Sequence, residues 1–463
     1  MKTLAVIFGN HISEIQKRAV EELTKILLDD TFEYPVCCEY REDLDMSGYT
    51  RIYLGTKENH RYIREHSPKE LTKAEEYCIK VEKDHAIIEG YDDAGVLYGA
   101  IDFYNKYILK YENPDTGASW LDGDSLPCFE YASSPSVAER GLWTWGHVIY
   151  DYRGYIDHMM KLKMNRLIIW NDFAPVNARD IVGYAHSRNV KVIWGFSWLW
   201  DTRCDRADLK HLDGYAEKIL SKYESEYADI GVDGIYFQTF TELKEDRIDG
   251  ILIAKAAADF VNDTAARFYE KYPTLEIQFG LHATSVKNRL AFIKTVDPRI
   301  RIVWEDCGAF PFSYDPNDVS DFDETKAFVG TIAGLRGAND RFGVVTKGFV
   351  KLDWTKFEHA EGAYCPGVSS EYMKHNRIER KRKIWRYMQA AWLRHADKAH
   401  DMVKEMCRIK NGELNIYALV EDGMFEENIM YPVALYSEML WDCEHDAKQL
   451  IQEVALRSYV TFA

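Results

Sequence analysis

The chain has 463 residues, enough for about three ordinary domains, or for two if one of them is a barrel. Its 58 Lys and Arg against 75 Asp and Glu give a formal net charge of −17, which argues against nucleic acid as a partner, because a phosphate-binding surface needs a basic excess. Hydrophobic residues make up 46% of the chain, which excludes intrinsic disorder. No apolar run reaches the roughly 20 residues of a membrane helix, so we expect no membrane partner.

The cysteines and the first residues bear on the compartment. Nine cysteines are scattered along the chain without a C-x-x-C pair, so we expect neither a disulfide framework nor a structural zinc site. The first apolar stretch ends at Gly9-Asn10 without a small-residue cleavage site, which favours a first strand over a signal peptide. We therefore expect a cytoplasmic protein. The oligomeric state stays open and includes a homo-oligomer.

Residues 1–130 alternate short strands with helices and predict a small α/β domain with a mixed sheet. Strands are predicted at 4–9, 34–42 and 51–56, a hairpin at 77–92 that turns at 82–84, and helices at 13–30 and 92–109. Residues 112–136 are rich in Pro, Gly, Asp and Ser, which indicates a linker.

From residue 137 to 463 a strand–helix rhythm takes over. Eight short apolar runs lie at 138–145, 165–172, 190–198, 234–242, 275–282, 301–307, 342–349 and 415–422. Clear helical patterns follow at 155–164, 178–189, 214–230, 251–272 and 431–442. Eight such units predict a (β/α)8 barrel. A doubly wound sheet is the rival, but it needs a Gly-rich phosphate turn that this sequence lacks.

In such a barrel the chemistry lies at the carboxyl ends of the strands. Those ends carry several carboxylates, one His and many Trp rings, which are the parts that a glycosidase needs to flank a glycosidic bond and to stack on sugar faces. The predicted catalytic residues are Glu242, Asp306 and Glu305. The predicted saccharide-binding residues are Trp145, Asp172, Trp198, His282, Trp304, Lys347, Glu421 and Asp422.

The catalytic candidates differ in their surroundings. Glu242 ends an aromatic run, where desolvation is expected to raise its pKa and keep it protonated as a general acid. The alternative is a surface carboxylate that begins the next loop. Strand alternation sends only one of Glu305 and Asp306 into the barrel mouth. Asp306 is slightly favoured, because it would share a face with Trp304, a predicted sugar platform.

The remaining candidates each have a structural alternative. His282 and Asp172 would bind sugar hydroxyls, or serve as a core histidine and a loop cap. Lys347 would suit an acidic sugar, or form a structural ion pair, and Glu421 and Asp422 begin the last loop. At least half of the Trp residues are expected to fill the barrel rather than to bind sugar.

Other chemistries find little support. The sequence has no H-x-H, H-E-x-x-H or G-x-S-x-G motif, so we predict no catalytic metal, no cofactor and no serine nucleophile. The basic run at 375–383 is interpreted as a solvated helix face that offsets nearby acid.

Three segments carry a family resemblance. They are 90–100 (GYDDAGVLYGA), 139–142 (ERGL) and 155–165 (YIDHMMKLKMN). They resemble the end of the small α/β domain and the start of the barrel in family 67 α-glucuronidases and family 20 β-hexosaminidases. The resemblance covers the domain order of essentially the whole chain, and it implies a small α/β domain ahead of a catalytic barrel.

The resemblance also implies roles for particular residues. In family 20 an Asp-Glu pair ends strand four, but Thr241 precedes Glu242 here, which speaks against a substrate-assisted mechanism. In family 67 a strand-four Glu is the acid and a strand-six Asp acts with a strand-seven Glu as base; Glu242 and Asp306 match the first two places. Strand seven offers Lys347 and Asp353 with no clear Glu, so the third place is unmatched.

The sequence therefore predicts a glycoside hydrolase that cleaves a small oligosaccharide with a carboxyl acid and a second carboxylate. A substrate-assisted β-N-acetylhexosaminidase and a non-catalytic sugar-binding barrel remain as alternatives.

Overall fold

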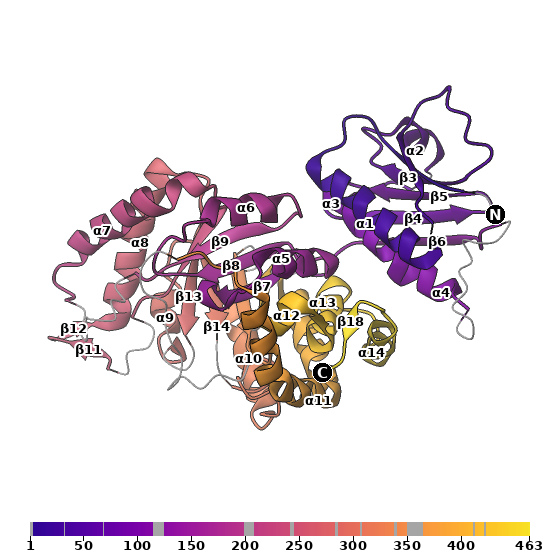
Figure 1. The fold of residues 1–463 in the computed structure, drawn as a ribbon. Coiled ribbons are helices and arrows are strands. Elements are labelled where there is room, and N and C mark those ends of the chain that lie inside the picture. Colours follow the sequence, from indigo (N-terminus) through magenta and orange to yellow (C-terminus); the bar gives the residue numbers. More distant parts are fainter. Residues whose placement is uncertain are drawn as a thin grey trace. The chain divides into compact units, whose positions relative to one another are not determined.

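The computed structural model describes residues 3–31, 33–67, 69–113, 125–198, 208–240, 245–282, 286–305, 308–337, 340–349, 364–410, 413–420 and 423–463 (Figure 1). The chain divides into two compact units. One comprises Met1–Pro135 with Ser187–Asn189, and the other comprises Ser136–His186 with Val190–Ala463.

The N-terminal unit is built on a six-stranded mixed sheet in the order β2-β1-β3-β5-β4-β6. Its strands are β1 (Leu4–Phe8), β2 (Val36–Glu39), β3 (Thr50–Gly55), β4 (Tyr77–Glu82), β5 (His85–Gly90) and β6 (Phe129–Ser133), and its helical segments are α1 (Glu14–Thr31), α2 (Arg61–His66), α3 (Asp93–Asp102), a π-helix (Phe103–Ile108) and α4 (Leu109–Tyr111). Asp92 caps α3 by accepting from the Gly95 amide at 2.8 Å. β6 corrects the expectation of a plain linker at 112–136, because it pairs antiparallel with β4.

The second unit contains a closed barrel of eight parallel strands, which confirms the predicted (β/α)8 fold. Its strands are β7 (Glu139–Trp145), β8 (Arg166–Trp170), β9 (Lys191–Gly195), β10 (Gly234–Phe237), β13 (Glu276–His282), β14 (Arg301–Glu305), β15 (Phe342–Thr346) and β16 (Asn415–Leu419). The helices around them are α5 (Tyr152–Lys161), α6 (Ala178–His186), α7 (Leu212–Glu226), α8 (Ile253–Lys271), α9 (Leu290–Ile293), α10 (Phe322–Ala333), α11 (Glu371–Lys410), α12 (Gly423–Glu427), α13 (Tyr431–Trp441) and α14 (Ala447–Ala455). Short additions are two 3₁₀ turns (Gly146–Val148 and Ala228–Ile230), a β11–β12 hairpin (Arg247–Ile248, Ile251–Leu252) and the pair β17–β18 (Ile429–Met430, Val460–Thr461).

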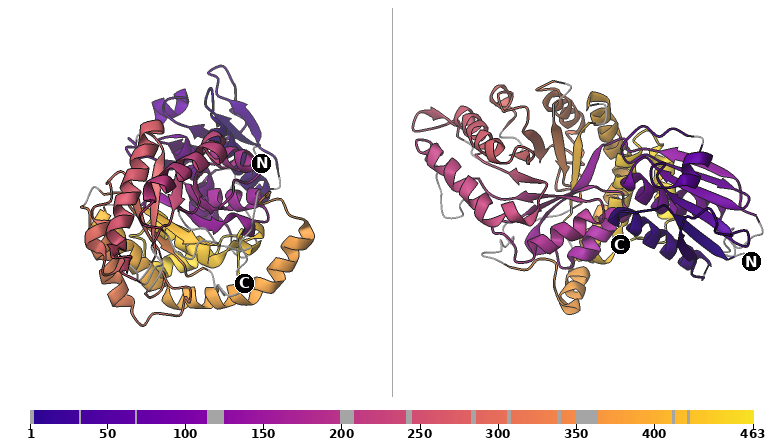
Figure 2. Two further views of the ribbon diagram at one scale, coloured as in Figure 1. Left: turned by 90° about the vertical axis from the view of Figure 1, so that its left-hand side faces the viewer. Right: turned by 90° about the horizontal axis from the view of Figure 1, so that it is seen from above.

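Alternation along each strand separates two apolar layers. Ile168, Ile193 and Val303 point inward and form a small core within the barrel. Their neighbours Leu167, Val192 and Ile302 belong to the much larger core between the strands and the surrounding helices. Figure 2 shows these helices around the strands of the barrel. The side-chain period of two therefore decides which polar residues reach the barrel interior.

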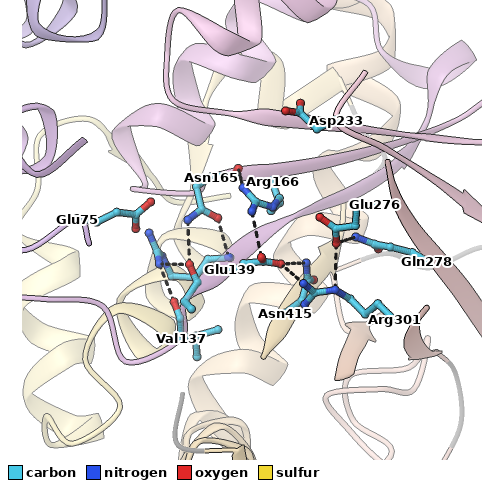
Figure 3. Close-up of polar contacts among 12 residues, drawn as sticks. Glu75, Val137, Glu139, Asn165, Arg166, Asp233, Glu276, Gln278, Arg301 and Asn415 are labelled. Carbon is cyan, nitrogen blue, oxygen red and sulfur yellow. Dashed lines mark hydrogen bonds and ion pairs between the residues drawn. The ribbon is translucent and has the colours of Figure 1, made fainter. Parts of the chain in front are cut away.

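A network of buried ions fills the amino-terminal end of the barrel (Figure 3). Glu139 accepts from Arg166 at 3.0 Å, from Arg301 at 2.8 Å and from the Asn415 amide at 2.9 Å. Arg301 also contacts Glu276 at 3.0 Å. Burial by itself raises the pKa of Glu139, but the two guanidinium groups outweigh it and lower that pKa to about 2. These charges are paired with one another, and chemistry is expected at the opposite end.

Candidate active site

The carboxyl end of the barrel collects polar side chains from three strands. Glu305 is the last residue of β14, while Gln238 follows β10 and Lys347 follows β15. Each lies two residues beyond an inward-facing side chain (Val303, Tyr236 and Val345), so all three point into the barrel.

Glu305 is a buried carboxylate surrounded by donors. It is 3% exposed, and one of its oxygens accepts from the Tyr236 hydroxyl and from the Gln238 amide. Its other oxygen lies 3.2 Å from Nζ of Lys347, which is itself 1% exposed. A carboxylate held by one cation and two neutral donors is stabilised in its ionised form.

Tyr236 is fixed in place by the backbone around it. Its side chain is fully buried, and its hydroxyl lies so close to β13 that a Cβ at Gly280 would come within 2.0 Å of it. Only glycine fits at that position. Burial, together with the charge of Glu305, raises the pKa of Tyr236 well above its ordinary value. The hydroxyl therefore stays protonated and serves as a permanent donor to Glu305.

Aromatic rings from β7 and β8 lie beside this group. Trp143 packs edge-on to Trp145 at 4.6 Å between ring centroids, and Trp170 contacts Tyr236 at 5.9 Å. Trp170 keeps part of its surface exposed, whereas Trp145 is 6% exposed. A partly exposed indole beside a carboxylate is suited to stacking on a sugar face.

Three of these residues were not among the predicted site residues: Tyr236, Gln238 and Trp170. Gln238 and Trp170 do lie at predicted strand ends. The period of two along β8 puts Trp170 on the same side as the inward-facing Ile168. Trp170 also pairs in register with the predicted platform Trp145. The contact between Tyr236 and Glu305 joins strands that are not sequence neighbours, and the period of two gives no indication of it.

Four predicted site residues lie outside the described residues, namely Glu242, Asp306, Glu421 and Asp422. His282 ends β13, and its backbone pairs in register with Glu305, which puts it in the same row of the barrel. The described part of the chain does not include its side chain.

Asp172 and Lys347 take part in contacts within the protein. One oxygen of Asp172 accepts from the Ser197 amide at 3.1 Å, so this carboxylate joins the loops after β8 and β9. Lys347 pairs with Glu305 and also lies 4.8 Å from the ring centroid of Tyr314. Both roles correspond to the structural alternatives considered for these residues.

Two predicted sugar platforms are core residues instead. Trp198 is fully buried and stacks on Phe237 at 3.6 Å, and Trp304 is 1% exposed and packs against Phe312 at 4.7 Å. Both belong to the layer between strands and helices. This placement corrects the expectation for both rings, because neither has a face that a ligand can reach.

The described residues contain no group of three or more His, Cys, Asp or Glu side chains that could hold a metal ion. Among the same residues, no helix is long and apolar enough to cross a membrane.

Comparison with known proteins gives a match at the level of structure. No family model and no curated protein matches the chain. It is similar to a GH138 enzyme targeting pectin rhamnogalacturonan II (TM-score 0.55, 12% identity, covering 96% of this chain and 65% of that one). It is also similar to CpGH84B (TM-score 0.56, 11% identity, covering 98% of this chain and 70% of that one). A third similar structure is a family 20 β-N-acetylglucosaminidase (TM-score 0.53, 11% identity, covering 99% of this chain and 95% of that one).

The chain thus spans 65% of the length of the GH138 enzyme and nearly all of the family 20 enzyme. At 11–12% identity the similarity is one of fold. These three similar structures are glycoside hydrolases.

Proposed function

We propose that the protein is a glycoside hydrolase that cleaves the O-glycosidic bonds of a small oligosaccharide. The observation that carries the proposal is Glu305, a buried carboxylate at the catalytic end of a (β/α)8 barrel, held by Tyr236, Gln238 and Lys347. The aromatic rings beside it and the glycoside hydrolases that share the fold support the same class of substrate.

The donors around Glu305 suggest how two carboxyl groups divide the work. Because Glu305 is stabilised as an anion, it suits the second carboxylate of a glycosidase and not the acid. Glu242 keeps the role of general acid, as its place after the aromatic strand β10 predicts. Asp306 remains the alternative partner, although its main support was a platform role for Trp304, and that ring lies in the core.

In the proposed reaction, Glu242 protonates the glycosidic oxygen as the bond to the anomeric carbon breaks, and Glu305 stabilises the positive charge that develops on the sugar. Glu305 then either bonds to the anomeric carbon or takes a proton from the attacking water. Separations of about 5–5.5 Å between the two carboxyl groups lead to retention of configuration, and about 6.5–9.5 Å to inversion. The resemblance to family 67 favours inversion.

The test is hydrolysis of an aryl-glycoside panel that contains glucuronides, N-acetylhexosaminides and neutral hexosides. Wild type is compared with Glu242→Gln, Glu305→Gln and the exposed control Glu245→Gln. Loss of the acid should lower the rate by about 10²–10⁴ on poor leaving groups and much less on aryl groups of low pKa. Glu305→Gln should lower the rate with both kinds of leaving group, whereas the control Glu245→Gln should lower it with neither kind.

Other outcomes would change the proposal. Equal losses on both kinds of leaving group would contradict the acid role of Glu242. Turnover of N-acetylglucosaminides alone, inhibited by a thiazoline, would favour the substrate-assisted alternative. Tight saccharide binding without turnover, unchanged in Glu242→Gln, would favour a sugar-binding protein.

A further inference from the structure

The first half of α11 carries a dense run of basic residues. Between positions 374 and 386 the sequence contains seven Lys or Arg residues and a single acidic residue, Glu379. This balance is opposite to that of the whole chain, whose net charge is −17. Four of these cations, Arg380, Arg382, Lys383 and Arg386, are exposed, and we call them the basic face of α11.

Most cations of the basic face have no partner in the described part of the protein. Arg382 pairs with Glu379 at 2.9 Å. The side chains of Arg380, Lys383 and Arg386 form no hydrogen bond or ion pair with any residue that the structure describes. A solvated helix face that offsets nearby acid therefore accounts for Arg382 but not for the other three.

The spacing of these cations works against the helix that carries them. Arg382 and Arg386 are four residues apart, and Lys383 is three residues from both Arg380 and Arg386. Side chains three and four residues apart are neighbours on a helix surface, and like charges at these spacings destabilise the helix. A polyanion bound along this face would remove that repulsion.

Hydrogen bonds anchor this part of α11 at the carboxyl end of the barrel. The Tyr387 hydroxyl donates to Asp315, which lies in the loop after β14. The Trp392 indole donates to the Gly348 carbonyl at 2.8 Å, and Gly348 is the second residue beyond β15. The basic face thus belongs to the end of the barrel that holds the candidate active site, and not to the end that holds the Glu139 network.

The surroundings of the basic face favour a saccharide among the possible polyanions. A helix that binds a membrane surface buries apolar side chains in the lipid. Between positions 379 and 390 the exposed residues are Glu379, Ala390 and the basic face, with no large apolar side chain among them. The negative charge of the whole chain opposes binding to nucleic acid. Carboxylates of an acidic sugar are good partners, because a guanidinium group binds a carboxylate through two parallel hydrogen bonds.

We propose that the basic face of α11 binds the carboxylate groups of an anionic oligosaccharide that carries uronic acid units. The choice of a saccharide rests on the proposed function. Lys347 is already paired with Glu305, so it is not available to an acidic sugar. The basic face supplies cations for such units outside the reacting bond, and it makes the substrate of the proposed hydrolase an acidic one.

The test measures binding instead of turnover, with the full chain at physiological salt. The probes are an oligogalacturonate, a neutral oligogalactoside of equal length, a DNA duplex and phosphatidylglycerol vesicles. The basic-face variant, Arg380→Gln with Lys383→Gln and Arg386→Gln, is compared with a control that removes three exposed cations from the N-terminal unit, Arg64→Gln with Lys73→Gln and Lys83→Gln.

We expect the oligogalacturonate to bind wild type more tightly than the other three probes do. Its dissociation constant should be about tenfold higher in the basic-face variant and less than twofold higher in the control, since each exposed ion pair contributes little by itself. The single variant Lys383→Glu should also weaken binding, while its new pairs with Arg380 and Arg386 stabilise the helix. Circular dichroism melting of each variant checks that the fold is intact.

Four results would overturn the proposal. They are no binding of the oligogalacturonate, equal binding of the neutral oligogalactoside, equal weakening in both triple variants, and tighter binding of DNA or vesicles that the basic-face variant loses. The outcome is separate from that of the aryl-glycoside panel. Uronate binding without turnover would support the basic face and contradict the hydrolase, whereas turnover of neutral glycosides without uronate binding would do the reverse.

Discussion

The variant Tyr236→Phe, which lacks only the tyrosine hydroxyl, distinguishes a catalytic role for Glu305 from a structural one. In Tyr236→Phe the ring keeps its contacts with Trp143 and Trp170, at 6.1 and 5.9 Å between centroids. The hydroxyl is lost, and with it the hydrogen bond to Glu305 and the one that it accepts from the Gln238 amide at 3.3 Å. A hydrogen bond to a charged group contributes about 1.5–3 kcal/mol. If this contribution is realised only in the transition state, kcat/KM should fall by about 10- to 150-fold, because about 1.4 kcal/mol corresponds to a factor of ten.

The same variant should change the pH dependence. With one donor fewer, the ionised form of Glu305 is less stabilised, so the acidic limb of the pH profile of kcat/KM should move to higher pH. The assay uses whichever aryl glycoside wild type hydrolyses fastest, over a pH series, with urea unfolding of the same samples.

Tyr417→Phe is the matched control. Tyr417 is also fully buried in the barrel, but its hydroxyl meets Gln278 at 3.0 Å and Asn415 at 2.9 Å at the amino-terminal end. It should lose about 1–3 kcal/mol of unfolding free energy, since buried polar partners are left unsatisfied, without a change in the pH profile. If Tyr236→Phe also lost stability alone, with kcat/KM within twofold of wild type, Glu305 would be a structural ion and our assignment would be wrong.

Other predictions concern stability. The pKa of Glu139 is lowered to about 2, so the folded state is stabilised above pH 4.5 and loses this stabilisation as the pH falls toward 2. The free energy of unfolding in urea should fall over this pH range in wild type and should fall less in Glu139→Gln. Burial lowers the pKa of His60 to about 4, so stability should also fall between pH 6.5 and 4, and a His60→Gln variant should lack that step. Trp198→Ala should cost about 3–5 kcal/mol in denaturant unfolding, with turnover per folded molecule unchanged. Lys347→Met should lower the free energy of unfolding by about 3–5 kcal/mol, because it leaves the Glu305 carboxylate without its cation. Adding Glu305→Gln should restore part of that free energy, and strictly additive effects in the double variant would refute the ion pair.

The sequence predicted the barrel well because its strands are short apolar runs with clear boundaries. The first run, predicted at 138–145, is observed at Glu139–Trp145, and the run at 275–282 is observed at Glu276–His282. β6 was missed because it lies in a stretch rich in Pro, Gly and Asp, and its place in the sheet depends on pairing with β4. Local composition carries no information about such a partner.

The site was harder to predict, since the period of two leaves two choices for every strand. In β14, one choice puts Trp304 inside the barrel, and the other puts Val303 and Glu305 there. The structure has the second arrangement: the indole packs between strand and helices, and the carboxylate reaches the interior. The prediction that favoured Asp306 depended on the large ring of Trp304 lying on the sugar side. Ring size does not decide the face, because Trp143 and Trp145 lie in the barrel interior whereas Trp304 packs in the layer under the helices.

Charge alone does not distinguish the two ends of this barrel. Glu139 at one end and Glu305 at the other are both carboxylates beside cations in the barrel interior. The two carboxylates differ in the groups that contact their oxygens. Glu139 is shared by two guanidinium groups and an amide, which use its oxygens for contacts between strands. The described contacts of Glu305 are with one cation and two neutral donors, beside a partly exposed indole. The first arrangement joins the barrel strands, whereas the second keeps an anion ionised next to a surface on which a sugar can stack, and that difference is the physical basis for placing the chemistry at Glu305.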